Sequence, residues 1–273
     1  MAIKIGLNDL TPFFSLGIRY LVAGSSLALY LWIVDRKIIF EKQHLRLLIL
    51  ITLFNYIVPY SLVYWGEQFI YSDLTSVIFA MLPINVAILS YAFFKEEKFT
   101  YFDLLGIFIS FAGIVTIFSV TILKGIGFHF YGMIAVYLSS LSQAMMAIIL
   151  KKYKGQYHPL KINFFPILAT GIIITGFSFA VENLSNNIMT MSGIISILYL
   201  SIFGTVIAFG LYFWLIKQIK LSLFSSNACI LPVIAILVGW IFLNEKLTNL
   251  QILGSLLVLA GVLIITIQKI KKS

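Results

Sequence analysis

The chain has 273 residues, of which 61% are hydrophobic and only 11% are charged, and its formal net charge is +9. Soluble domains carry about 25% charged residues, so this composition excludes an ordinary water-soluble domain. The single Cys229 excludes an internal disulfide and a cysteine metal site. Apolar stretches of about 20 residues, the length that crosses a bilayer core, recur along the whole chain. The sequence therefore predicts an all-α polytopic membrane protein.

In chain order, nine segments are expected to span the membrane: 12–34, 45–65, 72–94, 101–121, 130–150, 162–182, 193–216, 222–243 and 248–268. Most of the 19 basic residues lie in the loops that follow the odd-numbered spans, or at the ends of the adjoining spans. Only Lys4, Lys124 and Lys246 lie on the opposite side, and Arg19 lies inside a span. Because basic loops stay in the cytoplasm, the pattern predicts a multi-pass protein of the plasma (inner) membrane with a cytoplasmic C-terminus.

A sequence pattern in spans three and four occurs again in spans eight and nine. The first copy contains Leu82-Pro83, Glu97-Lys98-Phe99-Thr100, Leu105-Gly106 and Ala112-Gly113; the second contains Leu231-Pro232, Glu245-Lys246-Leu247-Thr248, Leu253-Gly254 and Ala260-Gly261. The copies are five spans apart, an odd number, so they should cross the membrane in opposite directions. Inverted repeats of this kind are typical of secondary transporters.

The repeat divides the chain into a first half, 1–121, with about four spans, and a second half, 130–268, with five. Extending the alignment backwards pairs Pro12 with Pro159 and leaves segment 130–150 without a counterpart after Met1. The simplest hypothesis is a ten-helix design whose first helix is largely missing, through a late start site or a truncation.

These ordered motifs resemble those of EamA-type members of the drug/metabolite transporter superfamily, over essentially the whole chain. The resemblance implies ten helices in two five-helix repeats with cytoplasmic termini. It also implies transport, often outward, of amino acids, nucleobases, vitamins, other metabolites or drugs.

Polar side chains at membrane depth are the candidates for a substrate cavity. A buried amide needs a partner, so Asn55, Asn85, Gln143 and Asn227 should face protein or water. Asn85 and Asn227 share spans with Pro83 and Pro232, two prolines expected to kink their helices, and paired interrupted helices mark transporter binding sites. The alternative for each amide is a helix–helix hydrogen bond. Tyr64 and Tyr212 are further candidates, with interfacial belt aromatics as the alternative.

Arg19 lies seven residues after Pro12, on the order of 10 Å into its helix. An arginine at that depth costs about 2.5–3.5 kcal/mol unless it faces protein or water. One interpretation is that it snorkels to the interface or bonds the carbonyls of a neighbouring helix. The other is a cavity-facing guanidinium that binds a substrate carboxylate or phosphate.

Four glycines of the repeat predict close helix packing. Gly106 and Gly113 are seven residues apart and share one helix face, and Gly254 and Gly261 repeat this spacing. Small residues on one face let helices approach closely in lipid.

The sequence contains no catalytic constellation, no metal-binding motif and no phosphate-binding glycine loop. We therefore expect no enzyme, no cofactor and no nucleic-acid partner; the partners are the lipid bilayer and a small-molecule substrate. The leading hypothesis is a permease or exporter that moves a small metabolite, such as an amino acid or a related compound, by alternating access. The alternatives are a non-transporting or truncated membrane partner subunit and a membrane-embedded enzyme.

Overall fold

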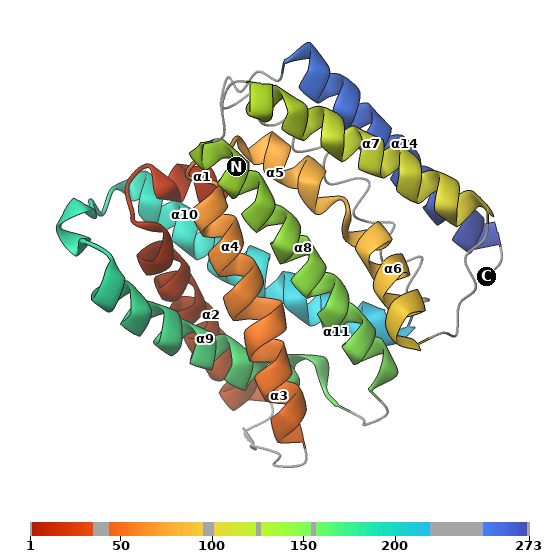
Figure 1. The fold of residues 1–273 in the computed structure, drawn as a ribbon. Helices are drawn as coiled ribbons and strands as arrows, with labels where there is room; N and C mark the ends of the chain where they lie inside the picture. Colours follow the sequence, from red (N-terminus) through yellow and green to blue (C-terminus); the bar gives the residue numbers. More distant parts are fainter. Residues whose placement is uncertain are drawn as a thin grey trace. The chain divides into compact units, whose positions relative to one another are not determined.

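The computed structural model describes residues 2–34, 44–94, 101–123, 127–153, 157–218 and 248–271. In this part of the chain all regular structure is helical (Figure 1). The α-helices are α1 (Ala2–Leu7), α2 (Pro12–Val34), α3 (Leu45–Ile51), α4 (Val58–Gly66), α5 (Ser72–Phe79), α6 (Leu82–Phe94), α7 (Tyr101–Leu123), α8 (Phe128–Lys152), α9 (Pro159–Val181), α10 (Met191–Ser201), α11 (Ala208–Gln218) and α14 (Asn249–Lys271). The described residues also form three other helical elements: the π-helical turns η2 (Thr52–Ile57) and η4 (Ile202–Ile207) and the 3₁₀ turn η3 (Leu184–Asn186).

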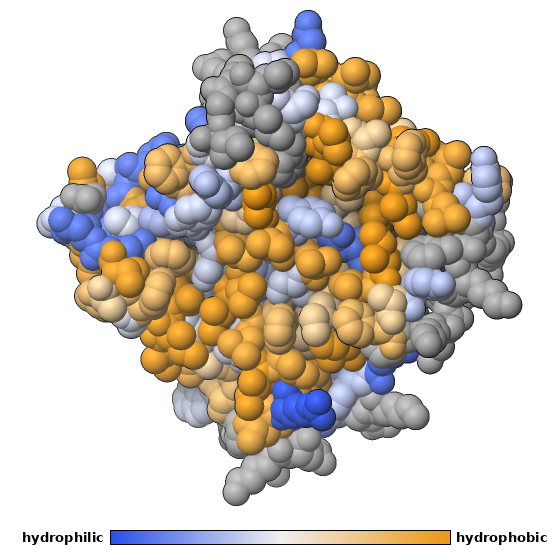
Figure 2. All heavy atoms as spheres, viewed as in Figure 1, coloured by the Kyte–Doolittle hydropathy of each residue, from blue (hydrophilic) through white to orange (hydrophobic). Residues whose placement is uncertain are grey.

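Six helical segments among the described residues are long and apolar enough to cross a membrane: Pro12–Val34, Leu45–Gly66, Leu74–Phe93, Phe128–Lys152, Pro159–Val181 and Met191–Gln218. Shorter apolar stretches lie in α7 and α14. The outward-facing side chains include Trp32, Phe108 and Phe179, each at least 66% exposed. Figure 2 shows hydrophobic atoms over much of the face in view. Such a surface suits lipid, as expected of a multi-pass membrane protein. The expected span 222–243 lies outside the described residues, so the count of nine remains a prediction.

The helices form two compact units. One contains α5, α6, α7, α8 and α14, and the other contains α1, α2, α3, α4, α9, α10 and α11 with the turns η2, η3 and η4. Each unit therefore takes helices from both predicted sequence repeats. The repeats and the compact units are different divisions of the same chain.

In the second unit, α2 packs along α9 (Figure 1). A Cβ added to Gly17 would lie 2.8 Å from the backbone nitrogen of Thr175, and one added to Gly171 would lie 2.7 Å from that of Leu21. Only glycine permits backbones to approach this closely. Because residue numbers rise along α2 as they fall along α9, the two helices run antiparallel.

The polar groups at one end of this pair also join the two helices. Glu182 follows the last residue of α9 and accepts hydrogen bonds at 2.9 Å from the backbone N–H groups of Phe13 and Phe14 in the first turn of α2. The hydroxyls of Thr11 and Ser178 donate to the same carboxylate at 2.9 and 2.6 Å. A carboxylate at a helix N-terminus satisfies free N–H groups and complements the helix dipole.

In the first unit, α7 packs along α14, and the two helices lie side by side in Figure 1. A Cβ added to Gly113 would lie 2.6 Å from the carbonyl oxygen of Gly254, and one added to Gly254 would lie 2.7 Å from that of Gly113. Further along, Gly261 meets Gly106 and Ser110. These helices also run antiparallel, and the four glycines of the repeated motif lie at their closest approach.

The third expected span is interrupted rather than bent. α5 ends at Phe79 and α6 begins at Leu82, so Pro83 occupies the first turn of α6. The two residues between these helices form a turn, and Leu74–Phe93 as a whole is long and apolar enough to cross a membrane. Proline has no N–H to bond the carbonyl four residues earlier, here that of Phe79, and the break falls between the two residues. Pro232, the other expected kink, lies outside the described residues.

Candidate functional site

The predicted cavity residues are divided between the two units. The unit around α2 and α9 contains Arg19, Asn55, Tyr64 and Tyr212, and the other unit contains Asn85 and Gln143. All but Tyr212 are less than 9% exposed. Asn227 lies outside the described residues.

Arg19 is 2% exposed and lies at the centre of a polar cluster in its unit. Its Nε donates a hydrogen bond to Thr205 Oγ1 at 3.0 Å, and its Nη2 donates to the carbonyl oxygen of Gly204 at 3.1 Å. Its Nη1 donates to the hydroxyl of Tyr64 at 3.3 Å. The guanidinium thus joins α2 to η4 and to α4.

Two π-helical turns supply residues of this cluster. In η4, which contains Gly204 and Thr205, the wider winding lets the N–H of Ala208 bond the carbonyl of Phe203, five residues earlier. In η2 the N–H of Val58 bonds the carbonyl of Leu53 in the same way. The turns lie in the second and the seventh expected spans. Single π-helical turns within α-helices are frequent at functional sites, because they redirect side chains and carbonyls.

Tyrosine rings enclose the guanidinium. Its Cζ lies 5.0 Å from the ring centroid of Tyr60 and 5.4 Å from that of Tyr20, within the range of a cation–π interaction. Tyr56 packs edge to face on Tyr20 and Phe209, with ring centroids 5.5 and 4.8 Å apart. We call Arg19, Tyr20, Tyr56, Tyr60, Tyr64, Gly204 and Thr205 the Arg19 centre.

A comparison with known families identifies the class of protein to which this cluster belongs. The model of the EamA-like transporter family matches residues 1–119 and 130–267. The chain belongs to the EamA-like transporter family. This confirms the resemblance drawn from the repeated motifs and makes the chain a member of a membrane transporter family.

Several relatives of this EamA-family chain carry transporter names. It is 27% identical over 262 residues to "Uncharacterized transporter YoaV" of Bacillus subtilis (strain 168), covering 96% of this chain and 89% of the relative. It is 29% identical over 269 residues to an "Uncharacterized transporter" of Archaeoglobus fulgidus, covering 97% and 92%. It is 27% identical over 276 residues to "Uncharacterized inner membrane transporter YedA" of Escherichia coli (strain K12), covering 98% and 85%.

A crystal structure also resembles the fold of this family member. The TM-score is 0.69 at 13% identity, and the match covers 98% of this chain and 95% of the other. At that identity the likeness shows the fold alone.

Within the described residues, every hydrogen-bond acceptor of the Arg19 side chain is neutral. The same unit holds further buried polar atoms. The hydroxyl of Tyr20 has no hydrogen-bond partner within 3.5 Å in the described part of the chain. A buried cation needs compensating groups, and a buried polar atom needs a partner. Among the described residues, the hydrogen-bonding capacity of Arg19 and Tyr20 is therefore not fully used.

Asn85 makes the helix–helix hydrogen bonds that were the alternative to substrate contact. Its Nδ2 donates to Ser140 Oγ on α8 at 3.1 Å, and its Oδ1 accepts from the hydroxyl of Tyr137 at 3.4 Å. Ser140 in turn donates to the carbonyl of Phe79 at 3.4 Å. That carbonyl is the one that would bond residue 83 in a continuous helix, and Pro83 has no N–H. Ser140 thus compensates for the interruption between α5 and α6.

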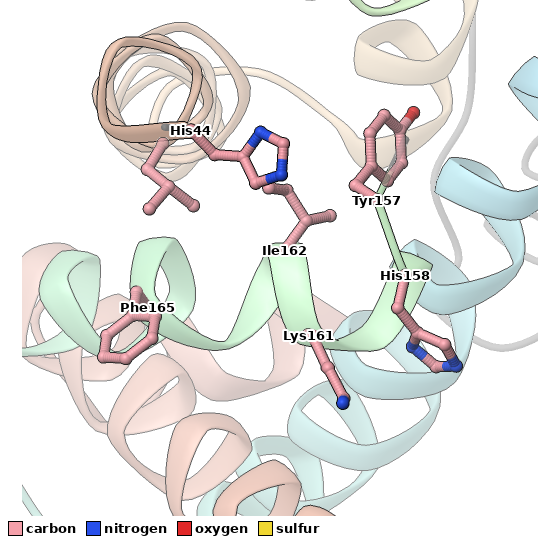
Figure 3. A pocket seen from close by; sticks show the side chains of 7 residues that line it. His44, Tyr157, His158, Lys161, Ile162 and Phe165 are labelled. Carbon is pink, nitrogen blue, oxygen red and sulfur yellow. The ribbon is translucent and has the colours of Figure 1, made fainter. Parts of the chain in front are cut away.

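A small pocket opens beside the start of α9 (Figure 3). Its volume is about 20 Å³, room for about one water molecule. Burial raises the pKa of the Tyr157 phenol to about 12. In Figure 3, His44 and Tyr157 lie on one side of α9, whereas His158 and Lys161 extend from the other. The pocket is too small for a metabolite, and its polar groups do not converge.

Several residues of the Arg19 centre were not among the sequence candidates, namely Tyr20, Tyr56, Tyr60, Gly204 and Thr205. One signal was available. Tyr56, Tyr60 and Tyr64 are spaced by four, which places three polar aromatic residues on one helix face. Thr205 and Gly204 carried no comparable signal, because an isolated threonine or glycine is common in apolar helices.

Proposed function

We propose that this chain is a secondary transporter that moves a small metabolite across the plasma membrane by alternating access of two inverted halves. The observation that carries the proposal is the antiparallel packing of repeat-equivalent helices. α2 corresponds to α9 through Pro12 and Pro159, and α7 corresponds to α14 through their glycine motif. Repeats of the same orientation would make equivalent helices parallel, whereas inverted repeats make them antiparallel.

The π-helical turns support the same proposal. η2 lies in the second expected span and η4 in the seventh, two spans that are equivalent in the proposed repeat. In transporters built from inverted repeats, interrupted helices meet the substrate near the middle of the membrane, and two similar halves exchange conformations around it. The broken helix α5–α6 is a further interruption of this kind.

Among the candidate residues, Arg19, Asn55, Tyr64 and Tyr212 are the proposed substrate contacts that the described geometry favours. The hydrogen bonds of Asn85 favour a structural role for that residue. Gln143 and Asn227 remain predictions. The proposed orientation keeps the basic loops and the C-terminus in the cytoplasm.

Flux through reconstituted protein tests the proposal. The purified chain would be placed in proteoliposomes and loaded with one of a panel of amino acids, organic acids, nucleobases and amines. We expect saturable counterflow of at least one compound above that of protein-free liposomes. Absence of counterflow for the whole panel, with protein that is folded and inserted, would favour the alternative of a non-transporting partner subunit.

A further inference from the structure

We infer that the Arg19 centre binds an oxyanion, and hence that the transported metabolite is a small organic acid with an apolar body. This inference rests on the proposed transport function and names its substrate class. It is argued from the charge and hydrogen-bonding capacity of Arg19, from its fixed orientation, and from the groups around it.

In the described part of its unit, the hydrogen-bond acceptors of Arg19 include no carboxylate. A guanidinium carries five N–H donors, and three of them have acceptors here, which are a hydroxyl, a carbonyl and a phenol. Two donors therefore have no acceptor among the described residues, and the positive charge faces only neutral acceptors and tyrosine rings there. A buried cation whose partners are all neutral should therefore bind an anion that reaches it, because the two charges attract strongly at low dielectric.

The orientation of the guanidinium is fixed before a ligand arrives. Thr205 and Gly204 are consecutive residues of η4, and they accept from Nε and Nη2, two nitrogens on one edge of the guanidinium. Tyr64 holds the third nitrogen from α4. A planar group held in this way presents its remaining N–H groups in a defined plane, which suits the two oxygens of a carboxylate.

The surroundings of Arg19 match the rest of such a ligand. The rings of Tyr20, Tyr56, Tyr60 and Phe209 pack edge to face on one another beside Arg19 and form an apolar surrounding. Tyr20 is completely buried, and its hydroxyl has no hydrogen-bond partner among the described residues. Binding sites for small metabolites combine such apolar walls with a few polar groups that orient the ligand. A carboxylate on Arg19 with an apolar body against the rings satisfies both parts.

Binding of matched compounds tests this inference without any variant. Wild-type protein in detergent would be melted with acetate, butyrate, phenylacetate and phenyl phosphate, and with acetamide, butyramide and phenylacetamide. We expect at least one anion to raise the melting temperature and its uncharged counterpart to leave it unchanged. Equal shifts for acid and amide, or no shift with any anion, would overturn the inference. A response to phenyl phosphate alone would identify the oxyanion as phosphate.

Variants then locate the site. Arg19→Lys keeps the charge but loses the planar guanidinium, and Arg19→Gln loses both. We therefore expect the apparent Kd of the responding anion to rise about tenfold or more in each variant, and further in Arg19→Gln. Arg46→Gln removes one positive charge from an exposed position on α3 and is the matched control. Unchanged affinity in Arg19→Lys overturns the inference, even if Arg19→Gln does not fold.

The flux assay separates this inference from the proposed function. Counterflow of only neutral or cationic compounds, unaffected by Arg19→Lys, would overturn the oxyanion site and leave transport intact. Anion binding that depends on Arg19, without counterflow of any compound, would support the oxyanion site and overturn transport.

Discussion

At the scale of single residues, Arg19 shows how a membrane helix accommodates a charge. The cost of an arginine at this depth falls when neighbouring groups replace water. Here Gly204 and Thr205 replace water as hydrogen-bond acceptors on one edge of the guanidinium, and the rings of Tyr20 and Tyr60 lie near it. Tyr20 belongs to the same helix as Arg19, but Tyr60, Gly204 and Thr205 lie on other helical segments of the unit, so the residue depends on helix packing.

Replacing Thr205 by valine tests the strength of this arrangement. Thr205→Val keeps the shape of the side chain but removes the acceptor of Nε, so a charged donor loses its partner. We expect a loss of stability of about 1–3 kcal/mol, seen as a lower melting temperature in detergent.

The control for this prediction is Thr116→Val. Thr116 donates only to the carbonyl of Ala112 on its own helix, among the contacts described. Its replacement should change stability by no more than a few tenths of a kcal/mol, the usual effect away from buried networks. Equal effects of the two substitutions would contradict the role assigned to Thr205.

At the scale of helices, the break between α5 and α6 is an example of local and tertiary effects acting together. Pro83 removes the N–H that would bond the carbonyl of Phe79. Ser140, which lies on another helix of the same unit, donates to that carbonyl instead, and Asn85 donates to Ser140. The interruption is thus stable because α8 supplies what the helix lacks.

A double-mutant cycle tests this compensation. Ser140→Ala should destabilise the chain by about 1–3 kcal/mol, because a buried carbonyl and the Asn85 amide both lose a partner. Part of this loss should disappear in a Pro83→Ala background, since the restored N–H can bond the carbonyl of Phe79.

The adjacent Ser139→Ala is the matched control. Ser139 is also completely buried on α8, but its hydroxyl has no partner among the described residues, so its removal should cost little. If the loss from Ser140→Ala is the same in both backgrounds, Ser140 does not compensate for Pro83. Thermal unfolding in one detergent gives all the values.

At the scale of the whole molecule, the proposed inverted topology has a direct test. In a Cys229→Ser background, single cysteines at Glu97 and Glu245 would report the two equivalent turns. We expect an impermeant maleimide to label Glu97→Cys only from the cytoplasmic side and Glu245→Cys only from the outside. The cysteine-free chain is the control. Labelling of both turns from the same side would contradict the inverted repeat and with it the proposed mechanism.

Much of the protein was predictable from local features of its sequence. Long apolar segments determine a helical membrane protein, because transfer of side chains into lipid depends on composition summed over about 20 residues. The spacing of Gly106, Gly113, Gly254 and Gly261 places them on one face of each helix, whatever the partner helix is. The family resemblance also came from ordered local motifs, and the family match confirms it.

Only the tertiary structure decided which residues meet. Thr205 lies 186 residues from Arg19, and the contact requires both the packing of α2 in its unit and the wide turn of η4. In the same way, the structure assigned Asn55 and Asn85 to different units, although both are single amides in apolar helices. Hydropathy and periodicity describe one helix at a time. The partner of a buried polar group depends on how distant helices pack, and that is a property of the folded chain.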